Sequence, residues 1–298
     1  IIIQFLFSKF KISEVSIPTF YGEEISYVNG FYYAYKITVE SIKANFQKYA
    51  IFYEKKYDLN NNGNDYSFKK DFLSTHSLTI EQIKNNSKVL DIGCNQGDLI
   101  NHLVEEKKCE VIGIDKNETS PTKKIMKFIS YDLNNGLPDL NYDNLDYVVF
   151  LDVIEHLNDP ENFLNQLYEK ISENQKVEIL ISTPNISFFI IRLMLLFGSF
   201  NYGKKGILDK THTKFYTFNS FKKLIMNSNF KIIYKKGVPA PFPLALGNNF
   251  IGNNLLKINN LLIFLWKSFF SYQIFFKIKP NKSLNYLLNK AEEKINIY

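Results

Sequence analysis

The stretch Lys88-Val89-Leu90-Asp91-Ile92-Gly93-Cys94-Asn95-Gln96-Gly97-Asp98-Leu99 decides the fold of this chain. It begins as an apolar run, turns at two glycines, and continues into a helical pattern. Glycine adopts backbone dihedrals that other residues resist and lets a ligand approach the main chain closely. Asp91 stands at the carboxyl end of the apolar run, which is the edge where open α/β sheets bind ligands. The stretch therefore predicts a strand, a ligand-binding turn and a helix in succession.

More strands are predicted on the carboxyl side of this one. From Lys88 onward, short apolar runs alternate with helical patterns, which is typical of a mostly parallel sheet with helices on both faces. The runs are continuous rather than alternating, as expected when both faces of the sheet are buried. We predict six strands and an antiparallel seventh, at Lys88–Ile92, Glu110–Asp115, Lys127–Asp132, Leu145–Leu151, Lys176–Thr183, Phe230–Tyr234 and Ser271–Ile278.

Helices are predicted between these strands from their apolar stripes and their end signals. Asp159 followed by Pro160 is a typical helix start, and Thr217 can cap a further helix. The remaining predicted helical segments are Gly97–Lys107, an insertion at about 240–270 between the last two strands, and a final helix at Ser283–Lys294.

Two further carboxylates follow strands at the same edge of the predicted sheet. Asp115 ends the second strand and can accept hydrogen bonds from both hydroxyls of a ribose. Asp132 ends the third strand and could accept one from an adenine amino group. The structural alternative is that Asp91 only caps a helix and that Gly93 only supports a turn. NAD is disfavoured, because its fold uses G-x-G-x-x-G and this turn offers G-x-x-x-G.

The order of these motifs resembles class I S-adenosylmethionine-dependent methyltransferases, whose first motif reads hydrophobic-Leu-Asp-Ile-Gly-Cys-Gly-x-Gly. Asn95 replaces the middle glycine, and the resemblance runs from about Tyr53 to the C-terminus. It implies an α/β, Rossmann-like, seven-stranded fold with S-adenosyl-L-methionine as cofactor. The resemblance assigns the methionine part of the cofactor, its ribose and its adenine to Asp91, Gly93, Cys94, Gly97, Asp115, Lys116, Asp132, Leu133, Leu151 and Asp152.

A first candidate for the chemistry follows the fourth predicted strand. Asp152, Glu155 and His156 match the D-x-x-E-H element of the methyltransferase group that includes the ubiquinone-pathway O-methyltransferases. Imidazole titrates near neutral pH, so His156 is a candidate base that would deprotonate the acceptor. Two alternatives are that Glu155 and His156 organise the loop, or that they hold a divalent cation. We predict no metal.

A second candidate lies between the fifth strand and the next helix. Gly206–Thr217 resembles the G-x-L-D-x-T-H-x-R-F-F-T element of the same group, with Lys214 in place of the arginine. The resemblance places His212 at the mouth of the active site, and a structural role in the turn before Thr217 is the alternative. The apolar stretch Ile186–Phe200 is interpreted as core or lid, with contact to a lipid-linked acceptor as the alternative.

The N-terminal region differs in texture from the rest of the chain. Ile17–Gly30 resembles the tail of family 2 glycosyltransferases, which predicts an upstream glycosyltransferase domain in the parent polypeptide. We divide the chain into residues 1–52, a remnant of that domain or a simple N-terminal extension, and residues 53–298, the methyltransferase domain. The chain begins Ile-Ile-Ile and shows no signal peptide, so we interpret it as part of a longer polypeptide.

Composition limits the partners. The net charge of +6 comes almost wholly from lysine, with Arg192 as the one arginine, whereas nucleic-acid readers rely on arginine, so we predict no nucleic acid. Cys94 and Cys109 form no disulfide framework or zinc motif, which suits a reducing cytoplasm. Peripheral contact with an acidic membrane surface stays open.

We therefore expect methyl transfer to an oxygen or nitrogen of a small-molecule or glycan acceptor. In one form of this prediction the acceptor is lipid-linked. The alternative hypothesis, a non-enzymatic function, is a non-catalytic module that keeps the fold and scaffolds a fused glycosyltransferase. A third reading is a nucleotide-sugar or NAD enzyme.

Overall fold

The computed structural model describes residues 4–5, 10–16, 18, 29–48, 54, 56, 68–246 and 248–282. The chain divides into two compact units, one from residues 1–65 with 199–210, and one from residues 66–198 with 211–298. The predicted helix Ser283–Lys294 and most of Ile17–Gly30 lie outside the described residues. We call residues 1–65 with 199–210 the first unit, and residues 66–198 with 211–298 the second unit.

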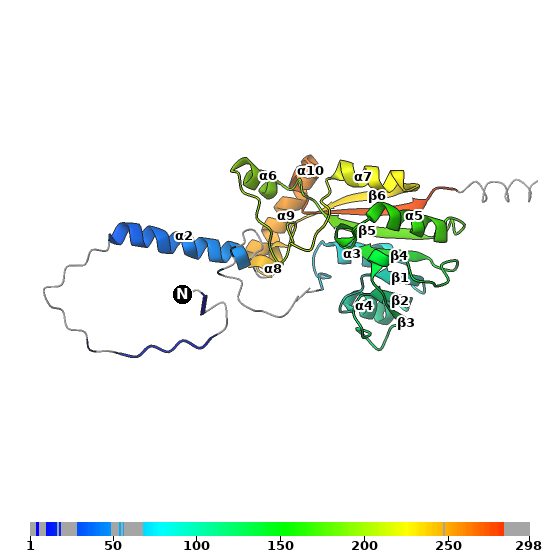
Figure 1. Ribbon diagram of the computed structural model, residues 1–298, viewed down its shortest axis with the longest axis horizontal. Helices are drawn as coiled ribbons and strands as arrows, with labels where there is room; N and C mark the ends of the chain where they lie inside the picture. The colour runs from blue at the N-terminus through cyan, green and yellow to red at the C-terminus, as the bar shows by residue number, and fades with distance from the viewer. Residues whose placement is uncertain are drawn as a thin grey trace, which may run out of the picture. The chain divides into compact units, whose positions relative to one another are not determined.

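The second unit contains a seven-stranded sheet with the order β3-β2-β1-β4-β5-β7-β6 (Figure 1). Strands β1 to β5 pair in parallel, and β7 runs antiparallel to both β5 and β6. This arrangement confirms the predicted α/β, Rossmann-like fold with an antiparallel last strand. The strands are β1 Lys88–Ile92, β2 Glu110–Asp115, β3 Lys127–Ser130, β4 Tyr147–Leu151, β5 Glu178–Pro184, β6 Phe230–Val238 and β7 Gln273–Pro280.

Helices cover both faces of this sheet because successive strand residues point to opposite sides. In β1, Leu90 and Ile92 belong to the apolar cluster under α5 (Pro160–Ile171) and α7 (Phe218–Asn227). Val89 belongs to the cluster on the other face, together with residues of α3 (Thr75–Gln82) and α4 (Asp98–Lys107).

The predicted helix starts are confirmed. The Asp159 side chain accepts a hydrogen bond from the Asn162 N–H at 3.0 Å, with Pro160 as the first helical residue. Thr217 and Ser220 form a reciprocal capping box at the start of α7.

Several strand bounds differ from the prediction, most importantly that of β3. This strand ends at Ser130, because the Asp132 side chain accepts from the Asn134 N–H at 3.0 Å and starts the short 3₁₀ helix η2, Leu133–Asn135. The fourth and fifth strands begin two residues later than predicted, β6 extends to Val238, and β7 is displaced by two residues. The turn formed by the Asp132 side chain therefore outweighs the apolar pattern that predicts a longer strand.

Helices also extend from the sheet after β5 and β6. Helix α6 (Phe189–Leu196) follows β5, and the predicted insertion before β7 consists of α8 (Phe242–Leu246), α9 (Phe250–Leu265) and α10 (Lys267–Phe270). Within the described part of the chain, no helix combines the length and the apolarity needed to span a membrane.

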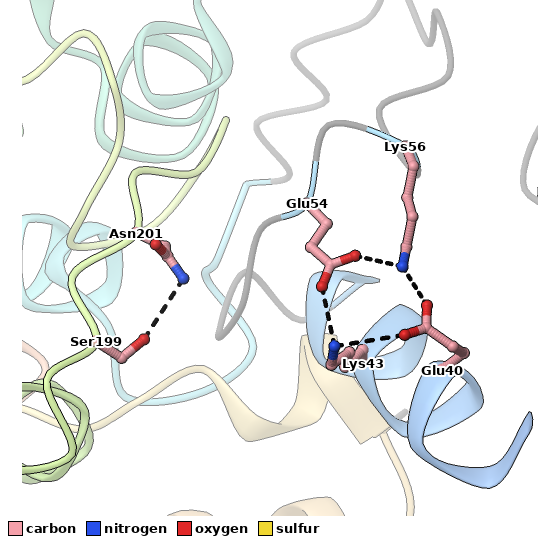
Figure 2. Close-up of polar contacts among 6 residues, drawn as sticks. All are labelled: Glu40, Lys43, Glu54, Lys56, Ser199 and Asn201. Carbon is pink, nitrogen blue, oxygen red and sulfur yellow. Dashed lines mark hydrogen bonds and ion pairs between the residues drawn. The ribbon is translucent and has the colours of Figure 1, made fainter. Parts of the chain in front are cut away.

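The first unit contains helix α2, Gly30–Lys48, which the sequence analysis does not predict. Lys43 and Lys56 each pair with the carboxylates of Glu40 and Glu54, at the C-terminal part of this helix (Figure 2). These side chains are partly exposed, so the network adds little to stability. In the 199–210 segment of the same unit, Gly203 and Asp209 form a short parallel bridge.

Candidate active site

The turn after β1 has three residues with left-handed backbone: Gly93 at φ +75°, Asn95 at +43° and Gly97 at +74°. The Gly93 N–H donates to the Ile114 carbonyl of β2 at 2.7 Å, which holds the turn against the neighbouring strand. A Cβ atom on Gly93 would lie 2.4 Å from Cγ2 of Val153. Both the positive φ angle and the lack of room for a Cβ atom therefore favour glycine at this position.

Asp115 lies at the carboxyl end of β2 and is 9% exposed. Its Oδ2 accepts the Asn95 N–H at 2.8 Å, and its Oδ1 accepts the Asn117 N–H at 3.1 Å. Each carboxylate oxygen can accept a second hydrogen bond. The side chain thus fixes the glycine turn and keeps acceptor capacity for a hydroxyl-bearing ligand.

Asp91 lies in β1 beside this turn and is 4% exposed. Burial, and secondly the charge of Asp115, raise the pKa of its carboxyl to about 7. In the part of the chain that the structure describes, no group donates a hydrogen bond to this carboxyl. A buried carboxyl of this kind fits a ligand that brings a cationic group, because the cation would favour the ionised form.

The remaining residues assigned to the cofactor are arranged less uniformly. Asp132 is exposed and lies two residues beyond β3, yet the Tyr131 N–H donates to the Asp115 carbonyl at 2.9 Å and keeps this segment beside β2. Lys116 is exposed, Leu133 is half-buried at the start of η2, and Cys94 is buried in the glycine turn. Burial raises the pKa of the Cys94 thiol.

Asp152 follows β4 in a left-handed conformation, with φ +55°. Its carboxylate accepts from the Ser182 hydroxyl at 2.8 Å and from the Gln273 side chain of β7. Leu151, the last residue of β4, is half-buried. The contact with Gln273 joins residues 121 positions apart, so no local pattern could have revealed it.

The structure brings the two candidate bases together. The rings of His156 and His212 have centroids 4.7 Å apart at an interplanar angle of 72°. Nδ1 of His156 lies 3.2 Å from the Thr211 carbonyl oxygen. A carbonyl can only accept, so Nδ1 donates in this contact, and in the neutral imidazole Nε2 is then the nitrogen without a proton.

Hydrogen bonds join the segments that carry these histidines. The Glu155 carbonyl accepts the Thr213 N–H at 2.8 Å and the Lys214 N–H at 3.1 Å. The Thr213 hydroxyl donates to the Leu157 carbonyl at 2.7 Å. The 211–217 segment is thereby fixed against the 3₁₀ helix η3, Ile154–His156.

The carboxylate of Glu155 forms a cluster with the two histidines, of which the sequence predicted only part. Ligand atoms of Glu155, His156 and His212 all lie within 4.8 Å of one another, and Glu155 is 1% exposed. Two imidazoles and a carboxylate are ligands that suit a divalent transition metal. Glu155 and His156 could be predicted for this role from their adjacency in the sequence, whereas His212 lies more than 50 residues further along the chain.

The sheet order, the glycine turn and the buried acidic strand ends define an α/β protein that binds a ligand at the carboxyl edge of its sheet. Residues 66–235 match the family model described as "Methyltransferase domain". This match covers more than half of the chain, so the chain belongs to this methyltransferase family. It is an S-adenosylmethionine-dependent methyltransferase.

Solved structures with a similar fold include a SAM-dependent methyltransferase from Archaeoglobus fulgidus, with 20% identity and a TM-score of 0.45, over 68% of this chain and 90% of that one. Another is the 1,6-didemethyltoxoflavin-N1-methyltransferase of Burkholderia thailandensis with its substrate and S-adenosylhomocysteine, with 10% identity and a TM-score of 0.47, over 87% and 93% of the two chains. No curated protein matches the sequence.

Proposed function

We propose that the second unit methylates an oxygen or nitrogen of a small or sugar-bearing acceptor, using the turn between β1 and α4 as its cofactor site. The observation that carries this proposal is the pair of buried carboxyls, Asp91 and Asp115, beside a turn with three left-handed residues. S-adenosylmethionine supplies an activated methyl group, so the protein mainly aligns the acceptor and removes its proton.

The cofactor contacts are assigned by chemistry. Asp91 faces the cationic methionine part, because a positive charge would favour the ionised form of its buried carboxyl. Asp115 binds the ribose hydroxyls with its remaining acceptor capacity. Asp132 and Leu133 border the adenine, and Leu151 and Asp152 line the methionine side, with the Asp152 carboxylate held by Ser182 and Gln273.

Proton removal is assigned to His156, with His212 beside it. The tautomer set by the Thr211 carbonyl makes Nε2 of His156 the basic nitrogen. Replacing His156 by Gln should lower kcat at least tenfold while the affinity for S-adenosylhomocysteine stays within about twofold, because general-base catalysis contributes about 10²–10⁴-fold.

Calorimetric titration with S-adenosylhomocysteine tests the cofactor site. Asp115→Ala should weaken binding at least tenfold, because hydrogen bonds to a charged group contribute about 1.5–3 kcal/mol each. Asp139→Ala is the matched control, since its carboxylate is fully exposed in the same unit. Unchanged affinity in a folded Asp115→Ala protein would contradict the assignment.

Two resemblances of the sequence support this acceptor class: Ile17–Gly30 resembles glycosyltransferase tails, and the two histidine elements resemble those of ubiquinone-type O-methyltransferases. Both support a hydroxyl-bearing acceptor made available by an upstream glycosyltransferase domain. Transfer of a labelled methyl group to sugar-bearing acceptors, compared with catechols, tests this class. Labelling of catechols but not of sugar-bearing acceptors would contradict the proposal that the acceptor bears a sugar.

The Glu155–His156–His212 cluster favours a second mechanism for the same reaction, in which a divalent cation binds the acceptor oxygen. A chelator separates the two mechanisms. Full turnover in EDTA supports the histidine base, and loss of turnover that Mn²⁺ or Zn²⁺ restores supports the metal.

A further inference from the structure

Helix α9 carries its polar anchor on the inner side and apolar side chains on the outer side. Asn259 is buried, accepts from the Ala240 N–H at 2.9 Å and donates to the Phe270 carbonyl at 2.9 Å. Ile258, Leu261 and Phe264 are 54%, 64% and 86% exposed. The exposed side chains of a surface helix in a soluble protein are mainly polar instead.

Helix α6 extends this apolar face. The ring of Phe189 in α6 contacts that of Phe270 in α10, with centroids 5.8 Å apart and an interplanar angle of 48°, and the Ser187 hydroxyl donates to the Ser268 carbonyl at 3.1 Å. These contacts fix α6 against the insertion. We define the apolar surface by the exposed residues Leu193, Leu195, Leu196, Phe197, Phe250, Ile251, Ile258, Leu261, Phe264, Leu265 and Trp266.

Basic residues greatly outnumber acidic residues in this part of the chain. Between Pro184 and Ala291 the sequence has sixteen lysine or arginine residues and one acidic residue, Asp209. Helices α6 and α9, which carry the apolar surface, and α10, which borders it, contain Arg192, Lys257 and Lys267 and no acidic residue. Exposed apolar side chains interspersed with cations are complementary to an anionic bilayer surface.

The topology places the apolar surface at the ligand-binding edge of the sheet. Strand β6 runs parallel to β5, because both are antiparallel to β7. The insertion leaves the sheet at Val238 and returns at Gln273, and α6 follows the carboxyl end of β5. These helices therefore extend from the edge that carries Asp91 and Asp115.

We propose that the second unit docks on an anionic membrane surface through α6, α9 and Trp266, which lies between α9 and α10. The 16 residues of α9 cannot cross a bilayer and would lie in its interface. A second copy of the chain fits this surface less well, since two cationic faces repel each other. Docking would turn the active-site edge toward the lipid, from which a lipid-linked acceptor could enter.

Trp266, the single tryptophan of the chain, lies in the apolar surface at 56% exposure and reports directly on docking. Vesicles of phosphatidylcholine and phosphatidylglycerol in equal parts should shift its emission to the blue and sediment the protein. Affinity should be at least about tenfold higher than for pure phosphatidylcholine, because each basic residue near an anionic surface contributes about 1 kcal/mol.

Two variants complete the test. Phe264→Ser should weaken vesicle binding severalfold without loss of stability, since the ring is exposed. Met126→Ser is the control, because Met126 is exposed just before β3 at the opposite end of the sheet. Three results would overturn the proposal: no emission shift, equal binding by both variants, or a concentration-dependent shift without lipid, which would indicate self-association. None of these readouts depends on methyl transfer.

Discussion

Asn95 occupies a backbone conformation that glycine usually provides, with φ +43° between two left-handed glycines. Asparagine tolerates this region, whereas alanine loses roughly 1–2 kcal/mol in it. Asn95→Gly should therefore keep wild-type affinity for S-adenosylhomocysteine, and Asn95→Ala should lower the free energy of unfolding by about 1 kcal/mol. Urea denaturation of both variants measures this difference. Equal stability of the two would show that the dihedral does not constrain residue 95.

Asp91 should make stability depend on pH in an unusual direction. Its pKa is about 7 in the folded protein and near 3.8 in the unfolded chain, so the folded state binds the proton more tightly. The free energy of unfolding should fall as pH rises from about 4 to about 7, by up to about 1.4 kcal/mol per pH unit, and then level off.

Subtracting the denaturation curves of Asp91→Asn from those of the wild type isolates this effect. A difference that rises with pH over the same interval would contradict the raised pKa. If the carboxyl pairs with a cationic group of the ligand, the affinity for S-adenosylhomocysteine should increase through pH 7, because the ionised form is then favoured.

At the scale of elements, the proposed catalytic arrangement depends on the hydrogen bonds between η3 and the 211–217 segment. Thr213→Ala removes the hydroxyl that bonds to the carbonyls of Leu157 and Glu155. We expect kcat to fall several-fold to tenfold through displacement of His212, with about 1 kcal/mol of lost stability. Thr213→Ser should restore kcat, because it keeps the hydroxyl. A variant with lowered stability and unchanged kcat would assign Thr213 a structural role only.

The sequence predicts those elements whose signals are local. Strands β1 and β2 were predicted with their observed bounds, because each is a buried apolar run bounded by polar residues or glycine. The predicted end of β3 was wrong, because the Asp132 side chain caps η2 instead of continuing the strand. Helix α2 was missed, because its aromatic and polar residues show no clear apolar stripe.

The candidate site was predictable only in part. The positions of Asp91 and Asp115 follow from two strand ends, whereas the bond from Gln273 to Asp152 and the approach of His212 to Glu155 depend on tertiary packing. The apolar outer face of α9 could not be predicted from composition, because it depends on Asn259 being buried.

At the scale of the whole molecule, every residue assigned to cofactor or acceptor chemistry belongs to the second unit. A protein lacking residues 1–65 should therefore bind S-adenosylhomocysteine within about twofold of the full chain, since a unit with its own core folds independently. Calorimetry on both proteins measures this. A tenfold loss of affinity would show that the first unit completes the site.

The insertion between β6 and β7 has its two ends fixed to each other. The Tyr272 N–H donates to the Val238 carbonyl at 2.8 Å, so the chain enters and leaves the helical segment at a single closed stem. Segments anchored in this way can be exchanged for others of different length or polarity while the strand register beneath them persists. A different insertion on the same stem would therefore change the surface that the unit presents beside the sheet edge, while Asp91 and Asp115 keep their places in the strands.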